Sequence, residues 1–245
     1  MQKDQNTQPT GIISMATPKK DIKEEFQQFI SRLENMVLIG MFQPRERLVE
    51  NDLAQQLGVR RNWIRDALKI LESKGLVKTV PYKGAMVRDL DEQEINEIFQ
   101  VRVVLEKLAN NLACENFNKP DAERLKEIAD RIKDSYKRNN FEKMLASNIE
   151  FHNHITELSK NPTLIQMINQ LRIRYHIFNT YAWSSPEIVN LILKEHEQFI
   201  TAMENKDRTL LDDLAEKHFS HSKDLYLLQL KTRRTTFSNT NGLGP

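Results

Sequence analysis

The sequence predicts a mainly α-helical protein, in which an N-terminal winged helix-turn-helix precedes an all-helical bundle of about six helices. The first indication is glycine, of which the 245 residues contain seven and none between Ala85 and Asn241. Such a stretch argues against tight hairpins and lacks the closely spaced glycines of Rossmann or P-loop nucleotide sites. The second indication is that apolar residues recur there at helical spacing. The third is the order of elements before Ala85, which is helix, helix, glycine turn, helix and two strands.

The N-terminal elements follow from helix-breaking residues and apolar spacing. Gly40 and Pro44 end a first amphipathic helix. Gly58 stops a short second helix, and Gly75 caps a third. The expected elements are helices at 21–41, 50–57 and 61–74, a strand at 76–80, a turn at 81–84 and a strand at 85–87. Two helices around a glycine turn, followed by a two-stranded wing, are typical of a winged helix-turn-helix.

Six amphipathic helices are expected after the wing. Pro120, Pro162 and Pro186 each follow polar residues, which is typical of helix starts. The expected spans are 91–116, 121–138, 141–159, 162–182, 186–205 and 208–230. We therefore divide the chain into a winged helix-turn-helix domain at 21–88 and a helical domain at 89–231. The polar tails at 1–20 and 232–245 are expected to be disordered.

Composition argues against several classes of protein. The chain has 36 Lys+Arg and 34 Asp+Glu, and its apolar runs are far shorter than the roughly 18 residues of a membrane helix. The first 20 residues lack the apolar core of a signal peptide, and the single cysteine, Cys114, fits a reducing compartment. We expect a cytoplasmic protein without membrane contact. Charge is uneven along the chain, because residues 43–83 carry net +4 and residues 88–230 carry net −5.

The third helix opens with side chains that can donate hydrogen bonds to DNA. A recognition helix enters the major groove by its N-terminal end, where arginines reach phosphates or guanine edges and asparagine pairs with adenine. At the wing tip, a lysine adds charge and a glycine lets the backbone approach a groove. The candidate DNA-binding residues are Arg60, Arg61, Asn62, Trp63, Arg65, Lys83 and Gly84. The alternative is a merely solvated basic face, but the position after a helix-turn-helix glycine favours double-stranded DNA as the partner.

Four stretches of this domain follow one recognisable pattern, namely Gly40–Leu68, Leu71-Glu72, Gly75-Leu76-Val77 and the wing Pro81–Val87. Together they resemble the GntR family of bacterial transcription regulators, which implies a regulator that binds an operator. Arg61 and Arg65 match the family's DNA-contacting arginines. Arg60, Asn62 and Trp63 stand where the family has small hydroxyl residues, so the operator sequence cannot be inferred from relatives.

Three histidines and an asparagine have spacings that suit a metal site. Asn148 and His152 are four residues apart and share one helix face, whereas His196 and His218 lie on consecutive helices, 22 residues apart. Three neutral imidazoles and one oxygen ligand, with positions left open, suit zinc or nickel. Alternatively, these histidines are unrelated surface residues. His221, one turn after His218, could also take its place.

Four motifs of the helical half occur together, namely Arg102–Glu106, Asn148–His152, Glu195-His196 and His218. They resemble the FCD ligand-binding domain of the FadR subfamily of GntR regulators, and six helices favour its VanR-like branch. The resemblance implies a metal held by Asn148, His152, His196 and His218. Asn148 departs from the usual aspartate, and its uncharged amide should bind a divalent cation more weakly.

Arg102 has two interpretations. By the resemblance, it lies near the effector pocket, where its guanidinium could pair bidentately with a carboxylate. By spacing, it forms a salt bridge to Glu106, one helical turn further on. Arg172 or Arg174 is a weaker candidate for the same pocket.

These expectations combine into a ligand-responsive transcription regulator and not an enzyme. We expect a homodimer that reads a palindromic operator, usually as a repressor, and an acidic metabolite that shifts the DNA-binding domains through residues 84–91. One alternative is a constitutive DNA-binding protein with a structural helical half. The other is a metal-dependent hydrolase, which needs a general base. Glu195 is poorly placed for that role, because it lies about 100° around the helix from His196.

Overall fold

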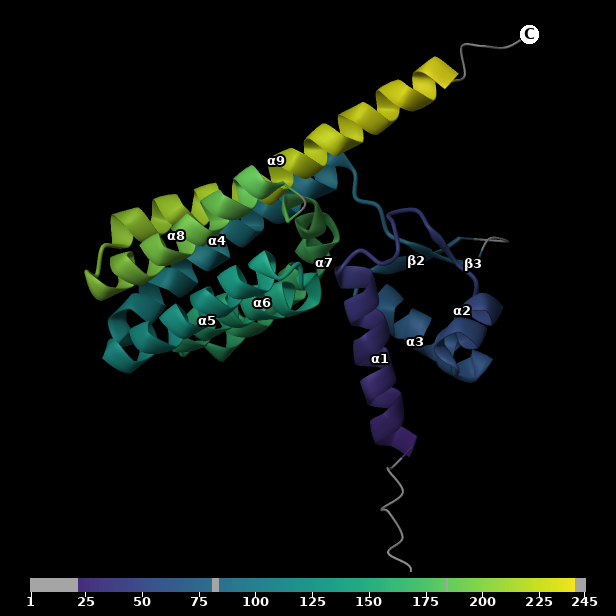
Figure 1. The fold of residues 1–245 in the computed structure, drawn as a ribbon, viewed down its shortest axis with the longest axis horizontal. Coiled ribbons are helices and arrows are strands. Elements are labelled where there is room, and N and C mark those ends of the chain that lie inside the picture. Colours follow the sequence, from purple (N-terminus) through teal and green to yellow (C-terminus); the bar gives the residue numbers. More distant parts are fainter. Residues whose placement is uncertain (1–21, 81–83, 184, 241–245) are drawn as a thin grey trace, which may run out of the picture.

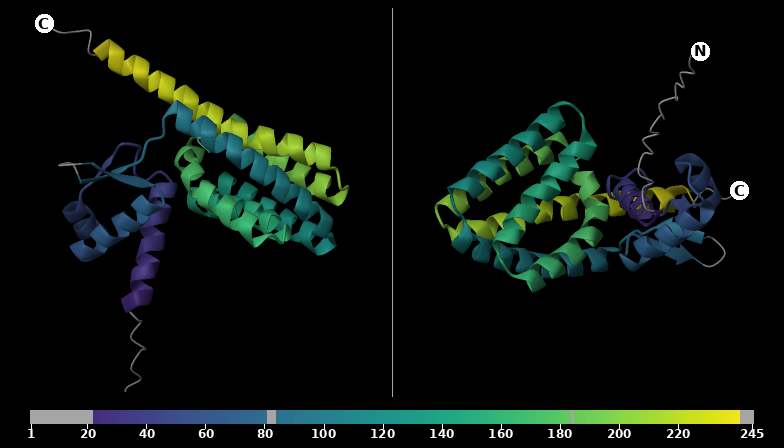
Figure 2. Two further views of the ribbon diagram at one scale, coloured as in Figure 1. Left: turned by 180° about the vertical axis from the view of Figure 1, so that it is seen from behind. Right: turned by 90° about the horizontal axis from the view of Figure 1, so that it is seen from below.

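The computed structural model describes residues 22–80, 84–183 and 185–240, which form a small N-terminal domain beside a larger helical bundle (Figure 1). The two parts meet near one end of the bundle, and the last helix runs along the bundle and continues past it on the side of the N-terminal domain (Figure 1 and Figure 2). This arrangement confirms the predicted mainly α-helical fold with a winged helix-turn-helix in front.

The N-terminal domain packs three helices against a small sheet. Its elements are α1 (Ile22–Leu38), β1 (Arg47–Leu48), α2 (Glu50–Leu57), α3 (Arg61–Ser73), β2 (Val77–Val80) and β3 (Gly84–Val87). The sheet has the order β1-β3-β2, and both pairings are antiparallel. The strand β1 was not among the expected elements, because two residues are too few to show a periodic pattern. It is defined only by its pairing, which sets Arg47 opposite Met86 and Leu48 opposite Ala85.

The core of this domain forms between α1 and α3. Ile64 and Leu71 on the inner face of α3 are completely buried, as is Leu33 of α1. Gly58 ends α2 in the left-handed conformation, with φ of 66°, which a residue without a side chain adopts at little cost. The chain therefore turns directly into α3 and leaves the N-terminal end of that helix exposed.

Six helices form the bundle over the described residues, close to the expected spans. They are α4 (Glu92–Asn116), α5 (Lys119–Lys137), α6 (Phe141–Leu158), α7 (Pro162–Ala182), α8 (Pro186–Glu204) and α9 (Arg208–Thr240). Polar side chains cap the starts of all six, namely Asp91, Asn118, Asn140, Asn161, Ser185 and Asp207. Helix α9 continues to Thr240 and so includes part of the polar tail that was expected from residue 232. Adding residues to an existing helix costs less than starting one, so polar sequence can extend it.

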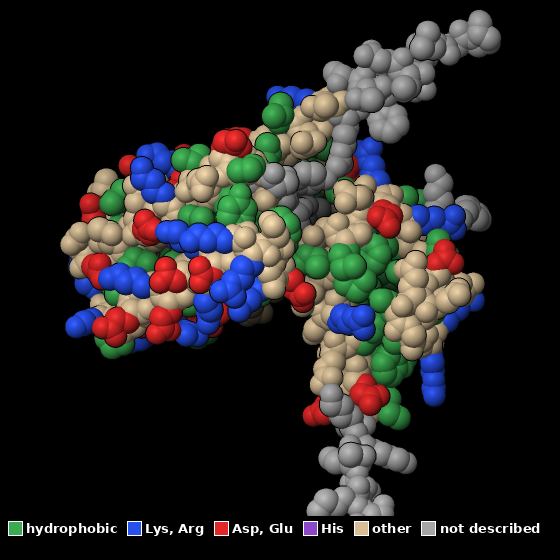
Figure 3. All heavy atoms as spheres, in the orientation of Figure 1, with side chains coloured by type: hydrophobic (Ala, Val, Ile, Leu, Met, Phe, Trp, Pro, Cys, Tyr) green, Lys and Arg blue, Asp and Glu red, His purple; other side chains and the backbone are tan. Residues whose placement is uncertain are grey.

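Helix α4 is central to the bundle. It packs against α6, α7 and α9, while α5 packs against α6 and α8. Large apolar side chains such as Phe151, Phe199 and Ile128 are buried between these helices. On the outer face, basic and acidic side chains intermingle (Figure 3), in keeping with a net charge of +2. No helix in the described part of the chain is long and apolar enough to cross a membrane.

A buried carboxylate joins the two domains. The side chain of Asp89, which lies between β3 and α4, is 4% exposed. It accepts a hydrogen bond from the Tyr226 hydroxyl of α9 at 2.5 Å and forms an ion pair with Arg45 of the N-terminal domain. Next to it, Arg88 pairs with Glu94 at the start of α4. The expected link at 84–91 is thus held by side-chain contacts to both domains.

We predict that Tyr226→Phe lowers the free energy of unfolding by about 1.5–3 kcal/mol, because a hydrogen bond to a buried charged acceptor is lost. Amide hydrogen exchange at residues 88–91 should also become faster. Urea unfolding and exchange mass spectrometry measure both effects. Tyr136→Phe, on the partly exposed surface of α5, is the control, and equal behaviour of the two variants would contradict the role given to Tyr226.

Candidate recognition helix and metal centre

The N-terminal end of α3 presents most of the expected DNA-binding side chains to solvent. Arg60 is the N-cap residue with an extended backbone, and its side chain makes no capping hydrogen bond. Arg60, Arg61, Asn62 and Arg65 are all exposed. Free backbone N–H groups at such a helix end favour phosphate. The wing is described only in part: Gly84 opens β3 with φ of 78° and open space around it, whereas Lys83 lies outside the described residues.

Two of these arginines are held by one acidic residue of α2. Glu50 accepts from Arg61 Nε at 2.9 Å and pairs with Arg65 Nη2 at 3.2 Å. The hydrogen bond from Arg65, together with the contact to Arg61, outweighs the effect of burial and lowers the pKa of Glu50. Sequence reasoning missed this residue, although a glutamate at the first position of the second helix was a visible signal. Because a guanidinium carries five N–H donors, these contacts leave further donors of both arginines available to another acceptor.

Trp63, in the first turn of α3, packs against α1. Its ring contacts Phe26 edge-on at 5.3 Å and Phe29 at 5.9 Å between centroids, and both phenylalanines belong to α1. Trp63 is partly buried and packs against the core of the N-terminal domain. Its large apolar ring gains from contact with α1, while its expected contact with DNA stays a prediction.

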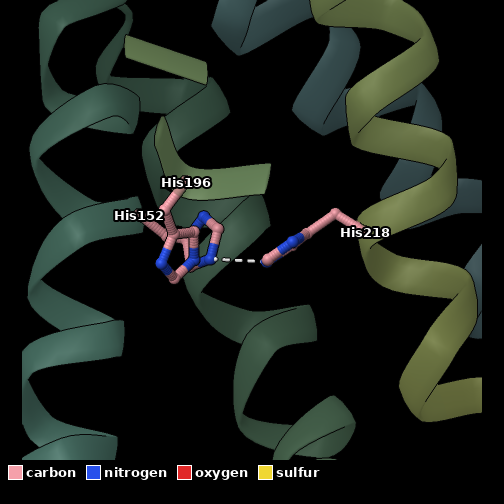
Figure 4. A group of neighbouring side chains, drawn as sticks. All are labelled: His152, His196 and His218. Atoms are coloured by element: carbon pink, nitrogen blue, oxygen red, sulfur yellow. Dashed lines mark hydrogen bonds between the residues drawn. The ribbon is translucent and has the colours of Figure 1, made fainter. Parts of the chain in front are cut away.

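The three expected histidines meet inside the bundle. His152 comes from α6, His196 from α8 and His218 from α9, and their rings point toward one another (Figure 4). One nitrogen from each lies within 4.8 Å of the others. The Nε2 atoms of His152 and His218 are 3.0 Å apart, a separation that suits neighbouring ligands of one ion with metal–nitrogen bonds of about 2.0–2.1 Å. The alternative of unrelated surface histidines is excluded, because all three are buried.

The state of these rings fits metal ligation. Burial is the main cause that holds the pKa values of His152 and His196 well below their usual range, and the neighbouring His218 ring acts in the same direction. Both imidazoles are therefore neutral, as a metal ligand must be. Neither ring nitrogen of His196 has a hydrogen-bond partner among the described residues, although the residue is completely buried. A buried polar group without a partner is costly, and an ion would supply the missing partner.

Asn148 lies one turn before His152 on α6, as expected. It is 5% exposed, and its Oδ1 has no hydrogen-bond partner in the described part of the chain. Asn148, His152 and His218 line one cavity of about 20 Å³. By this measure a single water needs about 10–15 Å³, so the cavity has room for an ion or a water but not for a metabolite.

Glu195 orients the third histidine. Its carboxylate accepts from His218 Nδ1 at 2.9 Å and from His221 Nε2 at 2.8 Å. Burial by itself would raise the pKa of Glu195, but these two contacts lower it to about 2. The suggestion that His221 could replace His218 is wrong in this structure, since His221 binds Glu195 instead. Sequence reasoning placed Glu195 only relative to His196 on its own helix and so missed its partners on α9.

Arg102 forms the ion pair with Glu106 that its spacing predicts, while its contact with an effector stays a prediction. Its guanidinium pairs with Glu106 at 3.2 Å and stacks between the rings of Tyr175 and Phe219, at 3.8 and 3.9 Å from their centroids. Arg102 also lines the cavity beside the histidines, and its Nη1 lacks a partner among the described residues. One donor of this buried cation thus remains available to a ligand.

Arg172 is the arginine of α7 that reaches the cavity. It is 5% exposed, and its Nη2 contacts Glu106 at 3.3 Å and Thr156 at 3.0 Å. Burial lowers the pKa of its guanidinium. Arg102 and Arg172 share the single carboxylate of Glu106, so the wall of the cavity carries more positive than negative charge. An anion is the chemical group that would balance it.

Comparison with known proteins gives a consistent result. The family model of the FCD domain matches residues 97–221, and that of bacterial regulatory proteins of the gntR family matches residues 26–87. The transcriptional regulator McbR of Escherichia coli is 27% identical over 178 residues, which are 72% of this chain and 80% of McbR. The gluconate operon transcriptional repressor of Bacillus licheniformis is 28% identical over 207 residues, 80% of this chain and 84% of the repressor. The solved structure of E. coli McbR/YncC shares the fold, with a TM-score of 0.72 at 24% identity over 84% of this chain and 98% of that one.

We predict that Trp63→Ala lowers the free energy of unfolding of the N-terminal domain by about 2–4 kcal/mol, because a large aromatic contact with α1 is lost. Arg60→Ala, next to the same helix end but exposed, should change it by less than about 0.5 kcal/mol. Thermal and urea unfolding measure the difference. Equal stability of the two variants would contradict the packing of Trp63 against α1.

Proposed function

The chain belongs to the GntR family of bacterial regulatory proteins and carries an FCD domain, and from this premise we propose a ligand-responsive regulator controlled by a small carboxylate. Membership in a family of transcriptional regulators confirms the prediction that the chain is not an enzyme, which removes the hydrolase. The finer proposal is a homodimer that binds a palindromic operator in the cytoplasm. We expect the protein to repress transcription, as the gluconate operon repressors among its relatives do.

One observation carries the ligand proposal. Inside the bundle, His152, His196 and His218 converge beside a cavity that Arg102 and Arg172 make positive. A divalent ion held by the histidines and the Asn148 oxygen would add a Lewis acid to that wall. A carboxylate ligand could make two contacts at such a site, because one oxygen can bind the ion and the other can accept a hydrogen bond from a guanidinium.

The size of the cavity gives the ligand a way to act. About 20 Å³ cannot hold a metabolite, so binding requires the walls to separate. A ligand that binds only the widened form shifts the population toward that form. Helix α9 provides His218 to the cavity and Tyr226 to the domain junction at Asp89. A change at the cavity can therefore reach the DNA-binding domain along one helix.

An apolar stripe supports the homodimer. Val101, Val104 and Leu108 follow one another at helical spacing on α4 and are 51%, 65% and 47% exposed. Met167 of α7 is 46% exposed, and α7 packs against α4. An apolar stripe on a charged surface is typical of a helix-to-helix interface. A second copy pairing through this stripe would bring two recognition helices to one operator, as a palindrome requires.

We predict that protein purified without a chelator or a His-tag contains about one equivalent of zinc or nickel, measured by elemental analysis. Changing His152, His196 and His218 together to Ala should remove the metal, because no strong ligand remains. His154→Ala is the control, since it lies on the same helix as His152 but outside the cluster. Full metal content in the triple variant would end the assignment.

We also predict that Arg61→Ala weakens binding to a mapped operator by about 1–3 kcal/mol, if Arg61 contacts a guanine. Fluorescence anisotropy at fixed salt measures the change. Arg208→Ala is the control, because it removes an exposed ion pair with Glu115 in the bundle. Unchanged affinity in Arg61→Ala would exclude this contact.

Responsiveness is tested by repeating the operator titration of metal-loaded protein with a panel of short mono-, di- and tricarboxylic acids. We expect at least one acid to change operator affinity five-fold or more, the lower range of allosteric coupling. The same acid should leave the affinity of the triple histidine variant unchanged. No change with any acid would favour constitutive DNA binding with a structural helical half.

A further inference from the structure

The four candidate ligands share one property, which is that none of them offers a negative charge to a metal ion. Three of them are imidazoles, which bind a metal in their neutral form, and Asn148 contributes an uncharged amide. A divalent ion at this place would keep its charge next to Arg102 and Arg172, which already share one carboxylate. Like charges in a buried site are costly because the interior screens them weakly. The site therefore needs negative charge from outside the ligand set.

Glu195 is positioned to provide it. Among the described residues, it is the carboxylate that hydrogen-bonds a candidate ligand, with Oε2 at 2.9 Å from His218 Nδ1. Its side chain is 10% exposed, so water weakens this contact little. The other oxygen, Oε1, is 2.8 Å from His221 Nε2. The two contacts hold the carboxylate in one orientation from one face of α9.

The geometry also decides which nitrogen of His218 is available. When Nδ1–H donates to Glu195, the lone pair of the neutral ring lies on Nε2. That atom faces His152 at 3.0 Å and belongs to the histidine cluster. A carboxylate behind a ligating imidazole fixes its tautomer and makes it a stronger ligand.

We propose that Glu195 is a positioning residue of the metal centre, which orients His218 and supplies the negative charge that Asn148 does not. The inference rests on the proposed metal site and extends it to a residue outside the ligand set. It makes Glu195 and Asn148 energetically linked, although one is on α8 and the other on α6. A carboxylate at either position reduces the need for the other.

The first experiment measures metal affinity directly. Zinc and cobalt are titrated into metal-free protein in competition with a chromogenic chelator. Glu195→Gln keeps an oxygen that can accept from His218 but removes the charge, and we expect it to weaken affinity 10–100-fold. Glu197→Gln, an exposed position on the same helix, is the control and should match the unmodified protein. The visible spectrum of bound cobalt should change only in Glu195→Gln, because a changed His218 alters the ligand field.

The second experiment tests the link to Asn148. Asn148→Asp adds a charge to the ligand set and should raise metal affinity in both backgrounds. The gain in metal affinity should be larger in Glu195→Gln than in the unmodified protein, because only in that variant do both positions 148 and 195 lack a carboxylate. Equal gains in the two backgrounds would overturn charge compensation, since independent sites give additive effects.

The outcomes separate this inference from the proposed function. If the unmodified protein binds neither metal, the proposed metal site fails. If it binds metal and Glu195→Gln binds as tightly as Glu197→Gln, the role of Glu195 is wrong while the site stands. Circular dichroism of the metal-free variants reports folding. Should Glu195→Gln not fold, His221→Gln loosens the same carboxylate without touching a ligand, and an unchanged affinity there would overturn the proposal.

Discussion

The structure depends on the burial of charge in the middle of a helical bundle. Arg102 and Arg172 lie among apolar helices and share the carboxylate of Glu106. Removing a charge from water costs several kcal/mol unless partners replace the solvent. The partners here come from different helices, so α4, α6 and α7 must keep their relative places for the charges to remain satisfied. Two arginines and one carboxylate leave an excess of positive charge beside the cavity, which favours a negatively charged ligand.

The histidine cluster adds a second requirement to the same place. His152, His196 and His218 are close enough to bind one ion, yet without an ion both nitrogens of His196 lack partners in the described part of the protein. Such a group is tolerated where binding later satisfies it. Glu195 also belongs to this arrangement, because it binds Nδ1 of His218 and so leaves Nε2 facing the other histidines.

The link to the N-terminal domain uses the same helix as the cavity. Phe219, which stacks on Arg102, shares an apolar cluster with Tyr226 and Leu90. Tyr226 in turn binds Asp89, which also holds Arg45. A single helix, α9, therefore contacts the cavity and the junction, which gives a mechanical reason for placing the effector site on the bundle.

The sequence by itself determined the approximate spans of the helices and the identities of the three histidines, because apolar spacing and helix-breaking residues are local properties of the chain. It did not reveal β1 or the packing of Trp63, since both depend on contacts with distant elements. It also could not pair Glu50 with two arginines or Glu195 with α9. Those pairings were decided by the tertiary structure, which alone brings charges from separate helices within hydrogen-bond distance.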